Sequence, residues 1–126
     1  MKLDQPDKCY YVENPMSQDY RCGLDIATII GSNLTHDYIF EHDLHDTEIP
    51  YSSKDLKILN NLYHLGKSFV ELYPINDEFK RSQLSIGCCM GRYPEDIYNG
   101  NGTSEGHPWF LAVSNSCLLV YNTIMD

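Results

Sequence analysis

The chain has 126 residues, of which 42% are hydrophobic, and it carries a net charge of −9 at pH 7. This length allows one domain at most, and the hydrophobic content is too high for a disordered tail. The acidic balance repels phosphate backbones, so we expect no nucleic-acid partner, and no stretch of about 18 apolar residues is present to form a membrane span.

The first predicted helix begins near Gly23 and holds closely spaced apolar residues as far as Ile30. These residues cover most of the helix circumference, which is typical of a buried helix. The stretch from His36 to Tyr51 mixes His, Asp and Glu with Pro50, and we interpret it as a long loop.

The second predicted helix covers residues 53–73 and has one apolar side and one polar side. Ser52 and Asp55 stand three positions apart, as in a capping box. The apolar side holds Leu56, Leu59, Leu62, Tyr63, Phe69, Val70 and Tyr73. Most of the polar residues fall on the other side: Lys54, Lys57, Asn60, Asn61, Lys67 and Glu71. Pro74 ends the helix.

The third predicted helix follows residues 75–107, which Pro94 and five glycines interrupt too often for a long element. Pro108 is a favoured first helical residue. The helix continues to Met125 with few charges, so we expect it to be buried on most sides. The fold class is therefore all-α. Two of the three helices are apolar nearly all round, which predicts that the chain is a piece of a larger structure.

The densest group of polar and aromatic residues lies at positions 91–98, in the loop before the third helix. Arg92 offers a planar fork of donors suited to paired hydroxyls or carboxylates. In a purely structural alternative, Arg92 pairs with Glu95 or Asp96 and fixes the turn. Adjacent residues usually point in different directions, so we do not assign Glu95 and Asp96 as a general acid–base pair.

Residues 42–46 offer a possible metal site, because two histidines and two aspartates supply four candidate ligands in five positions. A metal site needs fixed geometry and a supporting shell of hydrogen bonds, and we favour a solvated acidic loop here. The five cysteines include no C-x-x-C pair, which argues against a zinc ribbon and against a disulfide scaffold. We expect no metal and no cofactor.

Two sequons, at Asn33 and Asn101, are glycan acceptors only in a secreted or vacuolar chain. The first six residues contain no apolar run, so we expect no signal peptide. Because these two observations point in opposite directions, we assign no cellular location.

Two segments near the third helix resemble a known family. Residues 91–100, GRYPEDIYNG, and residues 106–112, GHPWFLA, are similar to the G-R-Y-P-E-D-x-Y-x-G and G-N-P-W-F-L segments of fungal and yeast glucoamylases, glycoside hydrolase family 15. Upstream, residues 23–32 resemble the family's G-L-D-x-x-T-L-L-G-S helix start, and residues 72–77 resemble a turn of its yeast members. The resemblance extends over about residues 20–121 and corresponds to a minor part of the family's catalytic domain.

This resemblance implies an (α/α)6 barrel, in which the three helices are inner, outer and inner. It also implies a substrate partner, an α-glucan such as starch or glycogen, or a maltooligosaccharide. The family removes glucose from the non-reducing ends of α-1,4-linked chains, and more slowly cleaves α-1,6 branches, with inversion. One glutamate protonates the leaving oxygen and a second activates water.

The resemblance implies substrate-binding roles for Arg92, Tyr98 and Trp109, which we expect at one end of the helical layer, near the start of the third helix. Arg92 should point along the same side as Trp109. For Glu95 and Asp96 it implies support of the loop rather than catalysis.

The two catalytic glutamates of the family belong to W-E-E and S-E-Q motifs, and this sequence contains neither motif. We therefore assign no catalytic residue and expect the chain alone to be inactive. His107 stands where the family has asparagine. The alternative, of a different class, is a non-enzymatic helical module that binds a partner protein through its uncovered apolar faces.

Overall fold

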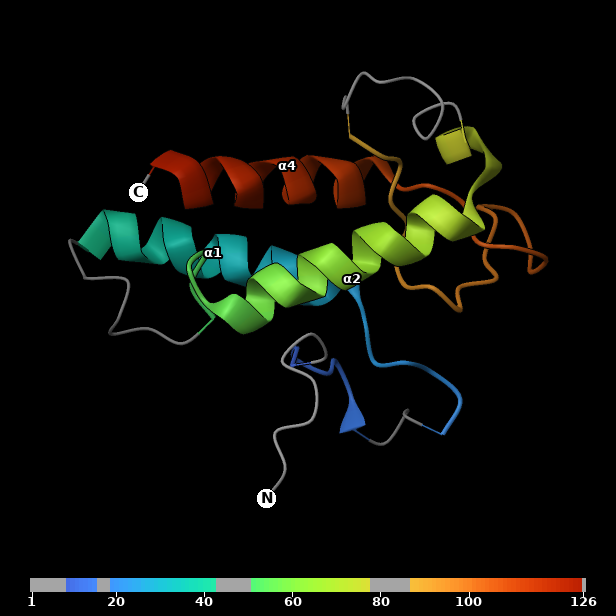
Figure 1. The fold of residues 1–126 in the computed structure, drawn as a ribbon, viewed down its shortest axis with the longest axis horizontal. Coiled ribbons are helices and arrows are strands. Elements are labelled where there is room, and N and C mark those ends of the chain that lie inside the picture. Colours follow the sequence, from blue (N-terminus) through green and yellow to red (C-terminus); the bar gives the residue numbers. More distant parts are fainter. Residues whose placement is uncertain (1–8, 16–18, 43–50, 78–86, 126) are drawn as a thin grey trace.

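The computed structural model describes residues 9–15, 19–42, 51–77 and 87–125, of which residues 36–42 are described by their backbone alone. The described residues form helices α1 (Ile26–His42), α2 (Leu56–Leu72) and α4 (Phe110–Met125), with a short 3-10 helix η4 (Pro74–Asn76) after α2 (Figure 1). Extended pairing within these ranges amounts to one isolated bridge between Tyr98 and Thr103. The all-α prediction is confirmed.

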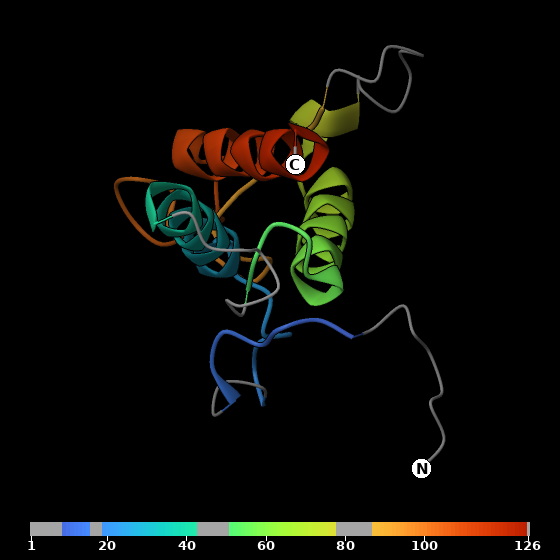
Figure 2. The ribbon, with the colours of Figure 1, turned by 90° about the vertical axis from the view of Figure 1, so that its left-hand side faces the viewer.

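Helix α1 packs against both α2 and α4. Figure 1 shows that α1 and α4 run in the same direction and that α2 runs the opposite way. The view from the side shows the three helices as the corners of a triangle (Figure 2). The segment that leads into α4 crosses the end of the molecule where α1 and α4 begin and α2 finishes. No helix in the described part of the chain is long and apolar enough to cross a membrane.

Helix α1 differs from its prediction at both ends. Asp25 caps the helix, because its Oδ1 atom accepts a hydrogen bond of 2.9 Å from the backbone N–H of Ala27. The helix therefore begins at Ile26 rather than near Gly23. It continues to His42, so the loop expected from His36 was wrong for residues 36–42. No proline or glycine lies between residues 32 and 42 to stop the helix.

Helix α2 starts three residues later than a capping box at Ser52 requires. Asp55 is the capping residue, and its side chain accepts from the backbone N–H of Lys57 at 2.8 Å. The capping box at Ser52 was therefore wrong, since Ser52 lies in the preceding turn and its carbonyl accepts from the N–H of Asp55. The buried face has the spacing of a packed helix and consists of Ile58, Asn61, Leu65 and Phe69.

The apolar side of α2 was predicted in a partly wrong register. Leu56 and Tyr63 were expected to be inside, yet they are 75% and 62% exposed. Asn61 was expected on the polar side, yet it is fully buried. Its side chain accepts from the N–H of Tyr11 at 2.9 Å and donates to the carbonyl of Tyr11 at 2.7 Å. These bonds satisfy the buried amide and tie the N-terminal segment to α2.

Helix α4 begins at Phe110, two residues after Pro108, and buries one narrow stripe formed by Ala112, Ser116, Leu119 and Asn122. The expectation that it is buried on most sides was wrong within the described chain. Phe110 is 90% exposed and Ile124 is 74% exposed. An apolar helix with such a narrow buried stripe is typical of an element taken from inside a larger structure.

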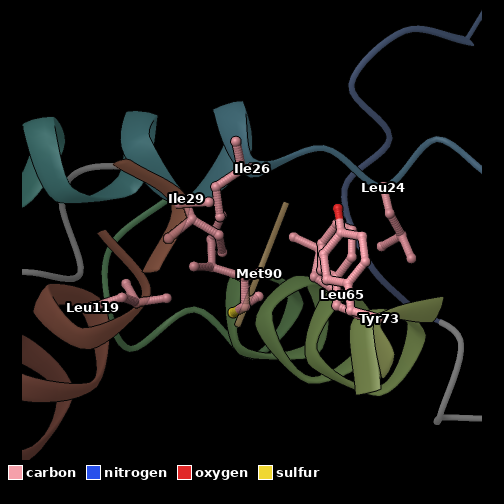
Figure 3. Packing of buried hydrophobic residues seen from close by; sticks show 10 residues of the cluster. Leu24, Ile26, Ile29, Leu65, Tyr73, Met90 and Leu119 are labelled. Carbon is pink, nitrogen blue, oxygen red and sulfur yellow. The ribbon is translucent and has the colours of Figure 1, made fainter. Parts of the chain in front are cut away.

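The hydrophobic core lies between the three helices and includes Met90 from the loop segment (Figure 3). Ile26 and Ile29 of α1, Leu65 of α2 and Leu119 of α4 meet there. Because the loop contributes a core residue, its course is fixed by the same packing that holds the helices together.

The sequon at Asn33 has a structural role. Asn33 is 2% exposed, and its Nδ2 atom donates to the carbonyl oxygen of Asn115 at 2.9 Å and to its Oδ1 atom at 3.0 Å. These two bonds join α1 to α4. The folded chain leaves no room for a glycan at Asn33, whereas Asn101 lies on an exposed turn.

Candidate functional site

The segment that carries Arg92 is held by the first residues of two helices. The N–H of Ile26, at the start of α1, donates to the carbonyl of Arg92 at 2.9 Å. The N–H of Trp109, just before α4, donates to the carbonyl of Met90 at 2.8 Å. The backbone on either side of Gly91 is therefore fastened to both parallel helices.

Gly91 packs directly on the end of α2. A Cβ atom at this position would collide with the hydroxyl of Tyr73 and would lie 3.0 Å from Cε1 of Phe69. The rings of Phe69 and Tyr73 are stacked, with centroids 5.1 Å apart. Close approach of the backbone to these rings explains why a glycine precedes Arg92.

Arg92 and Trp109 lie together at this end of the molecule, on the side expected from the sequence. The guanidinium carbon of Arg92 is 5.5 Å from the centroid of the Trp109 ring and 5.2 Å from that of Tyr93. Arg92 is exposed and Trp109 is partly buried. An arginine over an aromatic face is held in place by attraction to the ring, and its donors remain open to a ligand.

In the described part of the chain, a different arginine, Arg21, pairs with carboxylates. The purely structural alternative, in which Arg92 pairs with Glu95 or Asp96, is not found among the described residues. Glu95 instead accepts a hydrogen bond of 2.7 Å from the backbone N–H of Cys22, before α1.

Asp96 shapes the loop after Arg92. Its Oδ1 atom accepts from the N–H of Tyr98 at 3.0 Å, and its own N–H donates to the carbonyl of Tyr93 at 3.1 Å. Asp96 is 8% exposed, and its Oδ2 atom is buried without a hydrogen-bond partner. A Cβ atom at Gly106 would lie 2.5 Å from the carbonyl oxygen of Asp96, so the returning loop also passes close by.

Tyr98, the third predicted substrate-binding residue, is held by hydrogen bonds within its own loop. Its hydroxyl donates to the carbonyl of Gly100 at 2.9 Å, and its backbone forms the bridge with Thr103. The hydrogen bonds of Tyr98 therefore lie within its own loop, while Arg92 and Trp109 share a direct contact.

The sequence analysis missed Arg21, which lies against the same segment. Its guanidinium carbon is 3.7 Å from the centroid of the Tyr93 ring. Its side chain is 15% exposed and pairs with Asp25 at 2.8 Å and with Glu13 at 3.6 Å. Burial, the largest single influence, lowers the pKa of Arg21, but the hydrogen bond to Asp25 and the nearby negative charges of Asp25 and Glu13 together raise it by more. The opposite charges four positions apart were the available signal.

A cavity of about 550 Å³ lies between the end of α2 and the loop before α4. Its walls are Leu72, Tyr73, Pro74, Ile75, Pro94, Glu95, Asp96, Ile97, Ser104, Glu105, Gly106, His107 and Pro108. Burial, followed by the charge of Asp96, raises the pKa of Tyr73 to about 12. The Tyr73 hydroxyl is therefore a neutral donor at physiological pH.

Residues 42–46, where a solvated acidic loop was favoured over a metal site, fall mostly outside the described residues, because positions 43–46 are not among them. Within the ranges that the structure covers, no group of three or more metal-ligating side chains is found.

The described residues thus form an all-helical layer whose loop sets an arginine beside a tryptophan at the start of two parallel helices. The model of glycosyl hydrolases family 15 matches residues 4–125, and the chain belongs to this family.

The chain is similar to yeast glucoamylases over most of its length. It is 40% identical to a glucoamylase of Saccharomyces cerevisiae over 116 residues, which is 91% of the chain and 14% of that protein. It is 40% identical to a glucoamylase of Saccharomycopsis fibuligera over 122 residues, 95% of the chain and 22% of that protein. The chain thus spans less than a quarter of the length of these relatives.

A solved glucoamylase structure from Saccharomycopsis fibuligera superposes with a TM-score of 0.75 and 38% identity, covering 93% of the chain and 22% of that structure. The three helices are therefore part of an (α/α)6 barrel, as predicted. The opposite direction of α2 fits the alternation of inner and outer helices.

Proposed function

We propose that residues 1–126 belong to a glucoamylase-type catalytic domain, with the family-like region at about 20–121, and that they supply one wall of its glucan site. The whole domain would remove glucose from the non-reducing ends of α-1,4-linked chains, and more slowly at α-1,6 branches, with inversion. The contact between Arg92 and Trp109 carries this proposal, because it places a hydrogen-bond donor beside an apolar ring, and one sugar ring could bind to both.

Each proposed contact has a physical basis. The Arg92 fork presents several donors to neighbouring sugar hydroxyls, and hydrogen bonds from a charged donor are stronger than neutral ones. The Trp109 ring offers a flat apolar face to the C–H side of the sugar. Tyr98 would add a ring or a hydroxyl from the adjacent loop. Glucans carry no charge, so the acidity of the chain does not oppose their approach.

Glu95 and Asp96 are proposed as supports of this loop. Glu95 binds the backbone before α1, and Asp96 is turned inward onto its own loop. Inverting hydrolysis requires two carboxylates about 6.5–9.5 Å apart on either side of the scissile bond. The motifs that hold them in the family do not occur in this sequence. We therefore propose that the chain alone does not turn over substrate.

The exposed apolar side of α4 is the surface through which a protein-interaction module would bind its partner. Within a barrel, neighbouring helices would cover this side. The interaction module thus has no observation of its own, and one proposed function remains.

The single tryptophan of the chain is Trp109, so its fluorescence reports on the proposed site without a label. Titration with maltotriose should shift the emission to shorter wavelength with a dissociation constant of about 1 mM or weaker, because a partial site hardly offsets the entropy of association. Arg92→Lys should remove the response, whereas Lys67→Gln, on the exposed side of α2, should retain it. An equal response in the Arg92→Lys chain would contradict the proposal.

A further inference from the structure

The segment 92–96 is fastened to the segment 21–26 at three points. The Arg21 guanidinium carbon lies 3.7 Å from the centroid of the Tyr93 ring. The N–H of Cys22 donates to Glu95 at 2.7 Å, and the N–H of Ile26 donates to the carbonyl of Arg92 at 2.9 Å. The first of these contacts is between side chains, and a second guanidinium group lies near the same Tyr93 ring.

Tyr93 is shared by two guanidinium groups, because the guanidinium carbon of Arg92 lies 5.2 Å from the same ring centroid. Two like charges near one ring repel each other unless one is neutralised. Arg21 is neutralised by Asp25 at 2.8 Å and by Glu13 at 3.6 Å. The exposed Arg92 then carries the positive charge that remains beside Trp109.

We propose that Arg21 is a positioning residue for the glucan site, which holds the Tyr93 ring so that Arg92 stays beside Trp109. This inference rests on the proposed function, since Arg92 is the group that would meet the sugar. Arg21 is itself largely buried and acts through Tyr93.

Arg21 is suited to this task by its geometry. A planar guanidinium stacks on an aromatic face while its edge keeps bidentate contacts with carboxylates, which an ammonium does not do equally well. The Nε atom of Arg21 is buried without a hydrogen-bond partner, so its position is set by the ring and the two carboxylates. Removal of Arg21 frees one side of Tyr93 and with it the support of Arg92.

Iodide and acrylamide quenching of Trp109 fluorescence measures the position of Arg92 directly, with no sugar present. A unit charge 5.5 Å from the ring raises the local concentration of an anion by about twofold in water at moderate salt. The ratio of iodide to acrylamide quenching constants should therefore be higher in the wild-type chain than in the Arg92→Gln chain. Arg92→Gln sets the value expected when this charge is absent.

The Arg21→Met chain should lose most of this excess, with helix content by circular dichroism unchanged, and Lys67→Met should keep it. If Arg21→Met loses its helical signal, Arg21→Lys decides the matter, because it keeps the charge but not the planar stacking, and its ratio should fall part of the way. A wild-type ratio in the folded Arg21 variant, or an equal fall in Lys67→Met, overturns the inference.

Maltotriose titration of the same proteins separates this inference from the proposed function. A wild-type chain that shows the iodide excess and its dependence on Arg21, yet no response to maltotriose, supports only the hold of Arg21 on Arg92 and contradicts the glucan site. A response to maltotriose that Arg21→Met leaves unchanged contradicts the positioning role alone.

Discussion

Replacement of Gly91 by alanine tests how firmly the Arg92 segment is seated on the helices. The added Cβ atom would meet the Tyr73 hydroxyl far inside normal contact and would lie 3.0 Å from Phe69 Cε1. Phe69 is fully buried, and Tyr73 is 8% exposed and packs against it, although it also lines the cavity beside α2. Either the Tyr73 ring would have to leave its stack on Phe69, or the backbone at residue 91 would have to shift.

The expected cost follows from the chemistry of overpacking. Forcing one extra carbon into a well-packed site costs about 1–3 kcal/mol. With a denaturant slope of about 2 kcal/mol per M of urea, the unfolding midpoint should fall by about 1 M. The same shift should turn the Arg92 side chain, because the Arg92 carbonyl stays bound to the start of α1 and the backbone before it has to rotate.

Urea unfolding followed by circular dichroism measures the first effect, and the Trp109 emission maximum measures the second. Gly102→Ala is the matched control, since the nearest atom to its added Cβ is Asn99 Oδ1 at 4.0 Å and the substitution should be almost neutral. Equal midpoints for the Gly91 and Gly102 variants would refute the reasoning, because they would show that Gly91 is not in close contact with α2.

Two further predictions concern conditions and surface. The pKa of Tyr73 is raised from 10.0 to about 12 in the folded chain, so the stability that Tyr73 contributes is complete below pH 10 and is lost as pH rises towards 12. The urea midpoint should therefore drop between pH 10 and about 12, and it should drop less in Tyr73→Phe than in the wild-type chain. The pKa of Tyr11 is also raised to about 12, chiefly by its hydrogen bond to Asp55, so part of the drop should remain in Tyr73→Phe. A drop as large in Tyr73→Phe as in the wild-type chain would count against the contribution of Tyr73. Phe110 and Ile124 are 90% and 74% exposed, so the chain should associate at high concentration, and Phe110→Glu with Ile124→Glu should reduce light scattering without changing helix content; a wild-type chain that stays monomeric contradicts this.

The sequence predicted the parts of the fold that periodicity and punctuation define. The position of α2 follows from its apolar spacing and from Pro74, and the start of α4 lies within two residues of the expected Pro108. The end of α1 was missed because charged residues were interpreted as a loop, although neither glycine nor proline interrupts the helix there.

Buried asparagines are a feature that the sequence pattern did not show. Asn33, Asn61 and Asn76 are each at most 2% exposed, and each bonds to a residue distant in sequence. A polar residue on a helix suggests the solvent side, and only the tertiary partner shows otherwise. Asn76, for example, accepts from the N–H of Cys89 at 2.8 Å and so joins η4 to the segment before Gly91.

The candidate site was predicted from the family resemblance and not from periodicity. That resemblance named Arg92 and Trp109, and the structure brings them together. Arg21 could not be found in this way, because its proposed role depends on a contact with Tyr93, which is far away in the sequence. Pairwise contacts of this kind have no local pattern.

The most direct test replaces the matching part of the Saccharomycopsis fibuligera glucoamylase with residues 4–125 of this chain and measures kcat/KM for maltose. The chimera should release glucose, and Arg92→Lys should lower kcat/KM by about 10–100-fold, the loss of one well-made charged hydrogen bond. Lys67→Gln should leave it unchanged, and the chain alone should release no glucose. Full activity in the Arg92→Lys chimera, or turnover by the chain alone that Glu95→Gln abolishes, would contradict the account.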